Sequence, residues 1–380
     1  MTALSAPGHL PGPGTYPSFR LPAFPRFQPA LRRPALDELE SFCRTWLEDT
    51  LRPAHAEDPC AWEEFLQQRT TLWNLLTYPT CDPERTKTIC HWIDILFRID
   101  DLFVHAPRPR LDQLGLHRLD TALDPEQPTS QAPYPQVLAG LAQRLRAGMP
   151  PGLWDRFSQE TKGFFAACRT EREWLDEGTA VNLAMYEASR INSVAGGCFP
   201  LLEYGLGIDL TRELDTVPDL GRLTYLVARH WIAVNDIFSY RKEHYSGDTV
   251  NEITLALAAD GGDLQDAIDR ITQTVTDIED EFCTLAEQLL GDTDGQPPAV
   301  IQYIQALHWA IAGNLEWSYI TPRYNGRGHT WDGRTTATVV LTPHRTLYLP
   351  EQPCPPATPT HLDADSRTSP EEQTPTRPTS

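Results

Sequence analysis

From about residue 37 to residue 324, apolar residues recur at intervals of three and four positions, and this spacing limits the fold more than any other feature. It places apolar side chains along one face of an α-helix, whereas a half-buried β-strand alternates apolar and polar residues. Breaks rich in proline and glycine separate the periodic windows. The windows are residues 37–50, 60–76, 85–105, 135–149, 152–178, 180–193, 219–244, 248–259, 262–290 and 298–320. One short run, residues 338–341, is β-like, so we expect an all-α fold.

The two ends of the chain differ in composition from the helical region. Residues 1–35 are rich in proline and glycine and predict an irregular arm, part of which packs on the domain through its aromatic residues. Residues 36–325 are then a single helical domain, and residues 326–349 are a C-terminal extension. From residue 350 to residue 380 almost nothing is apolar, and we expect disorder there because such a segment cannot offset its chain entropy.

The chain carries 52 acidic and 32 basic residues, a formal net charge of -20. This excess of acid argues against a nucleic-acid surface, which needs basic residues to meet phosphates. A phosphorylated substrate would, for the same reason, need metal ions or a few well-placed arginines. The eight cysteines are scattered without a CxxC pair, which is typical of reduced thiols in a cytoplasmic protein. We see no secretory signal and no apolar run that could span a membrane, so we expect a cytoplasmic protein.

Asn235, Ser239 and Glu243 follow one another at intervals of four residues within a helical window. That spacing aligns an amide oxygen, a hydroxyl and a carboxylate as a stripe along one face of a helix. Oxygen ligands of this kind suit Mg²⁺, with water or phosphate completing its shell. Lys242 lies beside the stripe and could reach an anion held by the metal. The alternative is an ordinary solvated polar face, but the apolar residues just before Asn235 indicate burial.

Asp100 and Asp101 lie near the end of a segment, residues 92–104, that is apolar nearly all round. A helix of this kind is buried, and a buried carboxylate is costly unless it is paired or binds a metal. Phe97 lies one turn before the pair on the same face. The alternative is a helix end that frays into solvent and carries two ordinary surface acids.

Two further segments carry cations. Arg190 precedes Ser193, Val194 and a pair of glycines, and the glycines predict a break in the helix. Arg323 and Tyr324 follow the last long helical window, and an arginine fork and a phenol are good partners for phosphate oxygens. Taken alone, each segment could be structural.

Together these segments predict a cleft that is ionic at its mouth. The Asp pair and the stripe could hold several Mg²⁺ ions between two helices, and the arginines, the lysine and the tyrosine could bind the same anion. Candidates for an aromatic lining at greater depth are Trp92, Phe97, Phe238 and Trp317. Such a cleft suits an apolar chain that carries a diphosphate. Metals stabilise the leaving diphosphate, ring faces stabilise a carbocation, and exclusion of water prevents early quenching.

At these residues the sequence resembles the class I terpene synthases of bacterial type. Their metal motif reads (N/D)D(L/I/V)x(S/T)xx(K/R)E, and residues 235–243 match it at every defined position. The family's diphosphate-sensing arginine lies about 45 residues before that motif, where Arg190 stands, and its terminal Arg-Tyr pair matches residues 323–324. The family's Asp-rich motif resembles residues 100–104, although Val104 replaces its final acid.

The resemblance implies an α-helical bundle around a central apolar cavity. It also implies a Mg²⁺-dependent ionisation and cyclisation of a linear isoprenoid diphosphate, with three metal ions. The implied metal ligands are Asp100, Asp101, Asn235, Ser239 and Glu243. The implied diphosphate ligands are Arg190, Lys242, Arg323 and Tyr324. Among these, Asp100, the stripe and Arg190 would be catalytic, while Ser193 would be the linker and Val194 the effector whose carbonyl group faces the substrate.

The length of the substrate is open at this point, with farnesyl diphosphate favoured and geranylgeranyl diphosphate next. A chain-elongating isoprenyl diphosphate synthase would share the cavity and the metals, but it would carry an Asp-rich motif on each wall. A non-catalytic helical scaffold is a further interpretation, and it has no use for the arginines or the buried acids. The resemblance is compatible with a homodimer, which no feature of the sequence requires.

Overall fold

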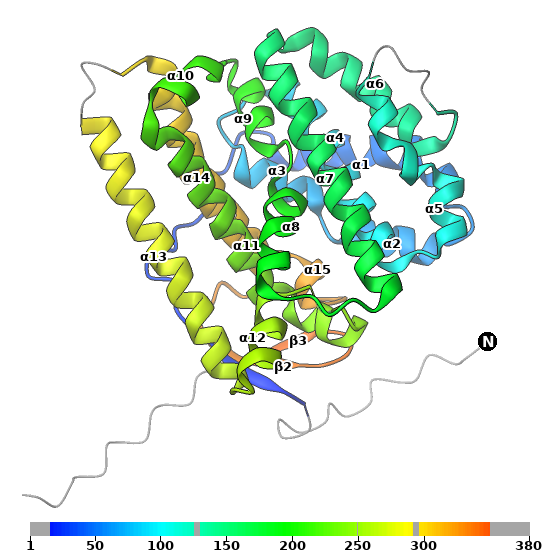
Figure 1. The fold of residues 1–380 in the computed structure, drawn as a ribbon, viewed down its shortest axis with the longest axis vertical. Coiled ribbons are helices and arrows are strands. Elements are labelled where there is room, and N and C mark those ends of the chain that lie inside the picture. Colours follow the sequence, from blue (N-terminus) through cyan, green and yellow to red (C-terminus); the bar gives the residue numbers. More distant parts are fainter. Residues whose placement is uncertain (1–15, 125–129, 249, 292–295, 350–380) are drawn as a thin grey trace, which may run out of the picture.

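The computed structural model describes residues 16–124, 130–248, 250–291 and 296–349, and within them the chain is an α-helical bundle (Figure 1). Its first half contains α1 (Leu36–Leu51), α2 (Pro59–Gln67), α3 (Thr70–Thr77), α4 (Pro83–His105), α5 (Arg108–Leu114), α6 (Pro133–Gly148) and α7 (Pro151–Glu177). Its second half contains α8 (Leu183–Ala195), α9 (Cys198–Leu206), α10 (Thr211–Thr216), α11 (Pro218–Ser246), α12 (Glu252–Asp260), α13 (Leu264–Gly291), α14 (Pro298–Ile320) and α15 (Pro322–Asn325). Two short 3₁₀ helices span Arg52–His55 and Leu116–Ala122. The all-α expectation is confirmed.

Most helices lie where the apolar periodicity predicts them, and the differences have local causes. The window over residues 60–76 is two helices, because Arg69 between α2 and α3 has a left-handed φ of 56°. The Arg69 guanidinium is bound by Glu40 at 2.7 Å. α12 begins at Glu252, because the side chain of Asn251 accepts a backbone hydrogen bond and caps the helix. α5, α9 and α10 have nine residues or fewer, too few for a periodic pattern to show.

The expected break after Arg190 is present. α8 ends at Ala195, Gly197 has a φ of 80°, and α9 follows directly. A Cβ atom at Gly196 would lie 2.5 Å from the Cβ of Phe164 on α7, so the close approach of the two helices requires glycine there. The chain therefore changes direction against α7.

The long helices pack around α11 and α8. α8 lies between α7 and α11, while α13 and α14 pack on α11 (Figure 1). α3 and α4 lie against each other and complete the bundle together with α14 and α7. No helix in the described parts of the chain combines the length and the apolar character needed to cross a membrane.

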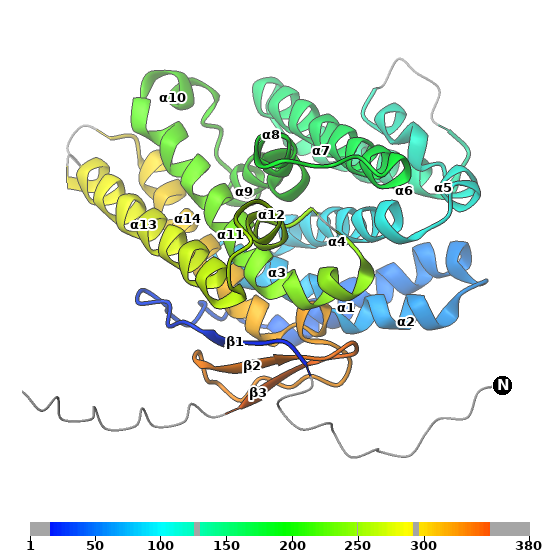
Figure 2. The same ribbon diagram turned by 60° about the horizontal axis from the view of Figure 1, so that its bottom comes forward.

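A small sheet covers one side of the bundle (Figure 2). It consists of β1 (Ser18–Leu21), β2 (Ala337–Leu341) and β3 (Thr346–Leu349), antiparallel and in that order. Part of the arm that was expected to be irregular is therefore a strand. Strands of four or five residues show little alternation, and β1 pairs Phe19 with Val339, 320 residues later in the chain. The tail expected to be disordered, residues 350–380, lies outside the described residues.

Gly313 is where α14 touches α3. A Cβ atom built there would lie 2.2 Å from the backbone oxygen of Leu76, and backbone cannot turn aside as a side chain can. We expect Gly313→Ala to lower the free energy of unfolding by at least about 2 kcal/mol, as measured by urea denaturation. The matched control is Gly140→Ala. This exposed glycine of α6 has nothing within 4 Å of such an atom, so the same change should raise the free energy of unfolding, by about 0.5–1 kcal/mol. Equal effects at both positions would contradict the helix contact.

Asp94 on α4 is a fully buried carboxyl group. Thr71 donates a hydrogen bond to it at 2.6 Å, and the amide of Asn74 lies 3.4 Å from its other oxygen. Burial raises the pKa of Asp94 to about 7, from an ordinary value of 3.8, and the hydrogen bond from Thr71 offsets only part of that rise. The folded protein therefore keeps this proton up to about pH 7, while the unfolded chain loses it near pH 4. Stability falls as pH rises between these values, because the folded state binds the extra proton.

We expect Asp94→Asn to remove this slope, because the amide does not titrate. The wild type should lose about 2–3 kcal/mol of its free energy of unfolding between pH 5 and pH 8, and the variant should not. The difference between variant and wild type should therefore increase by that amount. Urea denaturation at the two pH values measures the difference. If the difference in free energy of unfolding between variant and wild type were the same at pH 5 and pH 8, Asp94 would already be ionised in the folded protein at pH 5.

Candidate active site

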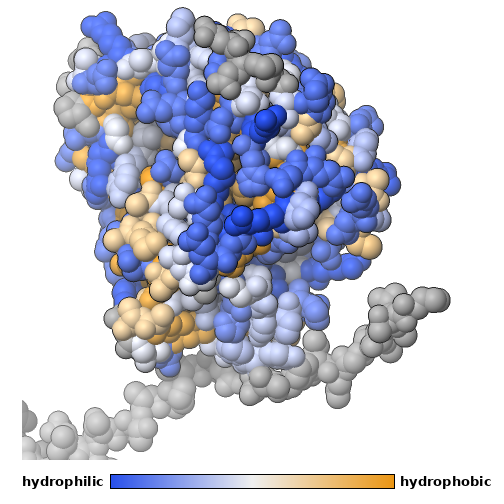
Figure 3. Space-filling view, turned by 45° about the vertical axis from the view of Figure 1, so that its right-hand side comes forward, coloured by the Kyte–Doolittle hydropathy of each residue, from blue (hydrophilic) through white to orange (hydrophobic). Residues whose placement is uncertain are grey.

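A cavity of about 380 Å³ lies inside the bundle. Its walls come from α3, α4, α7, α8, α11 and α14, together with α15. Of the residues expected to line it, the cavity wall includes Phe97, Ser193 and Val194. On the face shown in Figure 3, hydrophilic side chains predominate, with hydrophobic ones visible between them.

The C-terminal part of α4 forms the first wall and carries Asp100 and Asp101. Asp101 is 5% exposed, and Arg323 binds one of its oxygens at 2.7 Å while Lys242 binds the other at 3.0 Å. Asp100 lines the cavity and meets the second terminal nitrogen of Arg323 at 2.9 Å. Burial alone would raise the pKa of Asp101, but the charges of Arg323 and Lys242 outweigh it and hold the pKa well below its ordinary value. This wall is not the frayed, solvated helix end of the alternative interpretation.

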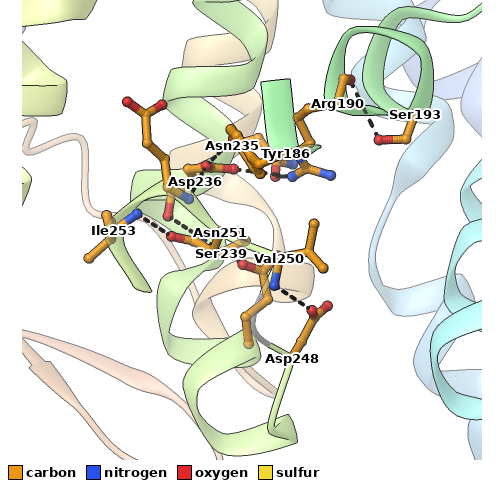
Figure 4. Close-up of polar contacts among 12 residues, drawn as sticks. Tyr186, Arg190, Ser193, Asn235, Asp236, Ser239, Asp248, Val250, Asn251 and Ile253 are labelled. Carbon is orange, nitrogen blue, oxygen red and sulfur yellow. Dashed lines mark hydrogen bonds and ion pairs between the residues drawn. The ribbon is translucent and has the colours of Figure 1, made fainter. Parts of the chain in front are cut away.

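The stripe on α11 forms the second wall, and Asn235, Ser239 and Glu243 all line the cavity. The side-chain nitrogen of Asn251 donates to Glu243 Oε2 at 2.6 Å and lies 3.4 Å from Ser239 Oγ (Figure 4). Because one nitrogen reaches both, these two candidate ligands lie close together. Burial, and then the negative charge of Asp248, raise the pKa of Glu243 to about 7.

Arg190 on α8 points at the stripe (Figure 4). Its Nη2 donates to Asn235 Oδ1 at 2.5 Å and to Asp236 Oδ1 at 3.2 Å. The side-chain nitrogen of Asn235 in turn donates to the hydroxyl of Tyr324 at 2.6 Å. A chain of hydrogen bonds therefore joins α8, α11 and α15. Every residue predicted to bind metal or diphosphate lies on this cavity or contacts a residue that does.

Asp236, Tyr186 and Asn251 belong to the site but were not predicted from the sequence. Asp236 is inaccessible to solvent, and its carboxylate accepts hydrogen bonds from the Tyr186 hydroxyl, from Arg190 and, at 2.7 Å, from the Glu252 amide (Figure 4). It thereby holds Arg190 against the stripe. The second position of the metal motif could have indicated Asp236, and the preference of asparagine for helix caps could have indicated Asn251. Nothing in the sequence connects Tyr186 with either.

Trp92 and Phe238 do not line the cavity formed by the described residues, so this part of the expectation is wrong. Trp92 is fully buried against α7, with its ring centroid 5.1 Å from that of Phe157. Phe238 turns toward the arm, and its ring centroid lies 6.4 Å from Phe24 and 4.8 Å from Tyr319. Both aromatic residues stand on helices that are buried on several faces. Periodicity alone cannot tell which of those faces meets the cavity.

Trp317 stands behind the cavity wall and not in it, which is a further correction. Its ring centroid lies 5.6 Å from that of Phe97, and its indole nitrogen donates to the backbone oxygen of Arg69 at 2.9 Å. Indoles that do reach the cavity include Trp73 and Trp231, whose ring centroids are 5.2 Å apart. The inner part of the cavity is aromatic, as expected, but most of its aromatic residues are not the predicted ones.

The oxygen atoms of the Asp pair and the stripe fit a hard divalent cation. In the described ranges no group of three His, Cys, Asp or Glu side chains forms a metal cluster, and the second wall combines one carboxylate with an amide and a hydroxyl. Mg²⁺ accepts such a set of oxygen ligands and leaves sites for water or phosphate. In this structure the oxygens face nitrogen atoms of Arg190, Lys242 and Arg323. The two walls are therefore already arranged to hold positive charge.

Comparison with known proteins identifies relatives of the chain. A family model described as terpene synthase family 2, C-terminal metal binding, matches residues 91–281, which are 191 of 380 residues and so just over half of the chain. The chain is 27% identical to microbial terpene synthase-like protein 13 of Selaginella moellendorffii over 313 residues, which cover 79% of this chain and 85% of that protein. It is 28% identical to sesquiterpene synthase Agr3 of Cyclocybe aegerita over 268 residues, which cover 64% of this chain and 72% of that protein.

The fold is similar to that of 2-methylisoborneol synthase from Streptomyces coelicolor A3(2), solved in complex with Mg²⁺ and 2-fluoroneryl diphosphate. The TM-score is 0.68, and the similarity covers 80% of this chain and 98% of that chain at 18% sequence identity. At this level of identity the comparison concerns the fold alone. It confirms the expected helical bundle.

Proposed function

Because this chain belongs to terpene synthase family 2 and is a terpene synthase, we propose that it ionises and cyclises farnesyl diphosphate in a reaction that depends on Mg²⁺. Terpene synthases convert isoprenoid diphosphates into terpenes. One observation supports the proposal most strongly. The oxygen-bearing walls of α4 and α11 lie together with several cationic side chains at the mouth of an aromatic cavity. Geranylgeranyl diphosphate is the next candidate substrate.

The proposed diphosphate ligands approach the mouth from three elements of the fold. They are Arg190 on α8, Lys242 on α11, and Arg323 with Tyr324 on α15. A protein with a net charge of -20 can hold a polyanion only through such local cations. Each of the three cations now contacts an oxygen of the two walls, and we propose that it turns to the diphosphate when metal occupies those oxygens. The planar forks of the arginines suit two oxygens of one phosphate.

The proposed metal ligands are Asp100, Asp101, Asn235, Ser239 and Glu243, for three Mg²⁺ ions. Bound there, Mg²⁺ would supply Lewis-acid stabilisation of the leaving diphosphate. The protein's part is to fix the ligand oxygens, which Asn251 does for Ser239 and Glu243. The Mg²⁺ and diphosphate analogue bound to 2-methylisoborneol synthase, which has a similar fold, support the assignment.

The preference for a fifteen-carbon substrate rests on the relatives of the chain. The relative from Cyclocybe aegerita is named a sesquiterpene synthase, the fifteen-carbon class.

The inner part of the cavity suits a carbocation. The rings of Trp73, Phe97 and Trp231 line it, and ring faces attract positive charge. The Arg323 guanidinium already lies 5.3 Å from the centroid of the Phe97 ring, so one cation–π contact exists at the boundary between the ionic mouth and the apolar depth. Val194, the proposed effector, lines the cavity at the helix break. Apolar residues around the cation would limit its contact with water.

The test is incubation of the purified protein with labelled geranyl, farnesyl and geranylgeranyl diphosphate in the presence of Mg²⁺. We expect a cyclic fifteen-carbon product from farnesyl diphosphate by mass spectrometry, diphosphate release at the same rate, and loss of both after chelation of the metal. Longer diphosphates formed on addition of isopentenyl diphosphate would favour the chain-elongating alternative. No solvent-extractable product from any of the three substrates would refute the proposal and leave the scaffold interpretation.

A further inference from the structure

The sheet contacts the short helix that carries Arg323 and Tyr324. α15 is four residues long, and a helix of that length has too few internal hydrogen bonds to hold its own position. Its side chains nevertheless meet Asp100, Asp101 and Asn235 at 2.6–2.9 Å. The neighbours of α15 therefore decide where the Arg-Tyr pair lies.

Arg241 holds the backbone of α15 from α11. Its side chain is buried, and its Nε donates to the carbonyl oxygen of Tyr324 at 2.9 Å. Asn235, six residues earlier on the same helix, holds the hydroxyl of Tyr324 at 2.6 Å. Six residues of α-helix rise about 9 Å, so α11 binds the two ends of this tyrosine. Both the backbone and the ring of Tyr324 are thus located relative to the helix that carries the stripe.

The C-terminal extension holds α15 from the other side. Tyr348 on β3 donates a hydrogen bond from its hydroxyl to the side-chain oxygen of Asn325, the last residue of α15. The next residue, Gly326, forms a β-bridge with the loop between β2 and β3. The same loop presents the carbonyl oxygen of Pro343 to Arg241, at 3.4 Å. Arg241 therefore connects α11, α15 and the sheet.

The N-terminal arm completes this support. β1 pairs with β2, and the amide of Leu341 donates to the carbonyl oxygen of Pro17 at 2.8 Å. Further along the arm, Phe24 packs on Phe238 of α11. The two ends of the described chain thus meet on the side of the bundle where α11 and α15 lie (Figure 2).

We propose that Arg241 and Tyr348 are positioning residues, and that the sheet sets the place of the Arg323–Tyr324 pair. The inference rests on the proposed function, because it assigns the sheet a role in binding the diphosphate of the substrate. Loss of either contact lets α15 shift and moves both ligands away from the anion. Binding of diphosphate then weakens, while the candidate metal ligands on α4 and α11 stay in place.

The test compares Arg241→Leu, Arg241→Lys and Tyr348→Phe with Tyr245→Phe as the matched control. The hydroxyl of Tyr245 donates to the carbonyl oxygen of Leu341 at 3.0 Å, so its removal also deletes one hydrogen bond to the sheet, but on β2 and not on α15. In each full-length variant we would measure KM and kcat with farnesyl diphosphate, inhibition by inorganic diphosphate with Mg²⁺, and Tm.

We expect Arg241→Leu to raise KM and the inhibition constant of inorganic diphosphate about tenfold or more, because a hydrogen bond from a charged group is lost. Arg241→Lys keeps the charge and should recover part of the loss. Tyr348→Phe should raise both constants about threefold, and Tyr245→Phe should leave them within about twofold. In all variants kcat should change less than KM.

Variants that lower Tm but keep the wild-type KM and inhibition constant would overturn the inference, because the sheet would then be structural only. Equal effects of Tyr348→Phe and Tyr245→Phe would overturn it as well. If Arg241→Leu does not fold, Arg241→Lys and Tyr348→Phe decide the matter. A wild-type protein that turns over no isoprenoid diphosphate would instead refute the proposed function, and binding of inorganic diphosphate would still test the sheet.

Discussion

Replacing Glu243 with alanine is expected to slow diphosphate release by at least about a thousandfold, or about 4 kcal/mol of transition-state stabilisation. Glu243 is the only acidic member of the stripe, so its loss leaves an amide and a hydroxyl, which bind Mg²⁺ weakly. Asn251, its partner at 2.6 Å, keeps its contacts with Ser239 and with the backbone oxygen of Asp236, so the protein should still fold. Asn235→Leu removes another proposed ligand of the same metal and should have an effect of similar size.

The matched control for this prediction is Glu173→Ala. It makes the same chemical change on an exposed face of α7 and should leave the rate within about twofold. Diphosphate release at saturating farnesyl diphosphate and Mg²⁺ gives the rate, and circular dichroism with Tm checks the fold. A titration with Mg²⁺ separates the causes, because loss of a ligand shifts the metal dependence and loss of fold does not. A Glu243→Ala rate within tenfold of the wild type would mean that the stripe is structural.

The stripe could be predicted because its geometry depends on one helix alone. Residues spaced by four on α11 keep their relation however the helix packs, so Asn235, Ser239 and Glu243 share a wall as expected. The partners of Asp101 depend on packing. Its ion pair with Arg323 joins residues 222 apart in the sequence, and only the placement of α15 brings them within 2.7 Å. The motif predicted which residues take part, and the fold determines which of them touch.

The aromatic lining and the sheet could not be predicted, for two different reasons. Trp92 and Trp73 both stand on buried helices, and the rotation of each helix in the bundle decides which ring meets the cavity. Rotation follows from packing against several neighbours, which periodicity in one segment does not describe. β1 is a strand of four residues whose partner lies near the other end of the chain. Its stability comes from that pairing and from burial of Phe19 and Leu21, not from a local pattern.

Arg190→Lys is expected to slow diphosphate release by about a hundredfold although the positive charge is kept. One terminal nitrogen of Arg190 contacts Asn235 at 2.5 Å and Asp236 at 3.2 Å. When metal takes the Asn235 oxygen, the contact with Asp236 can remain while the rest of the planar fork binds the diphosphate. An ammonium group is a point charge and cannot serve both partners in one plane. Burial would lower the pKa of Arg190, but Asp236 outweighs burial and raises it. The native side chain is therefore charged at every working pH.

Lysine is more informative than alanine at this position, because alanine would leave Asp236 buried without its cation, at a cost of about 3–5 kcal/mol in stability. Arg222→Lys is the matched control. Arg222 pairs with Glu281 at 2.6 Å on the surface, so its change should leave the rate unaltered and the stability within about 0.5 kcal/mol. Single-turnover rates and inhibition by inorganic diphosphate would be measured for both variants. A slow Arg190→Lys enzyme with unchanged affinity for inorganic diphosphate would place the role of Arg190 in the ionisation step. A wild-type rate would contradict its assignment to the site.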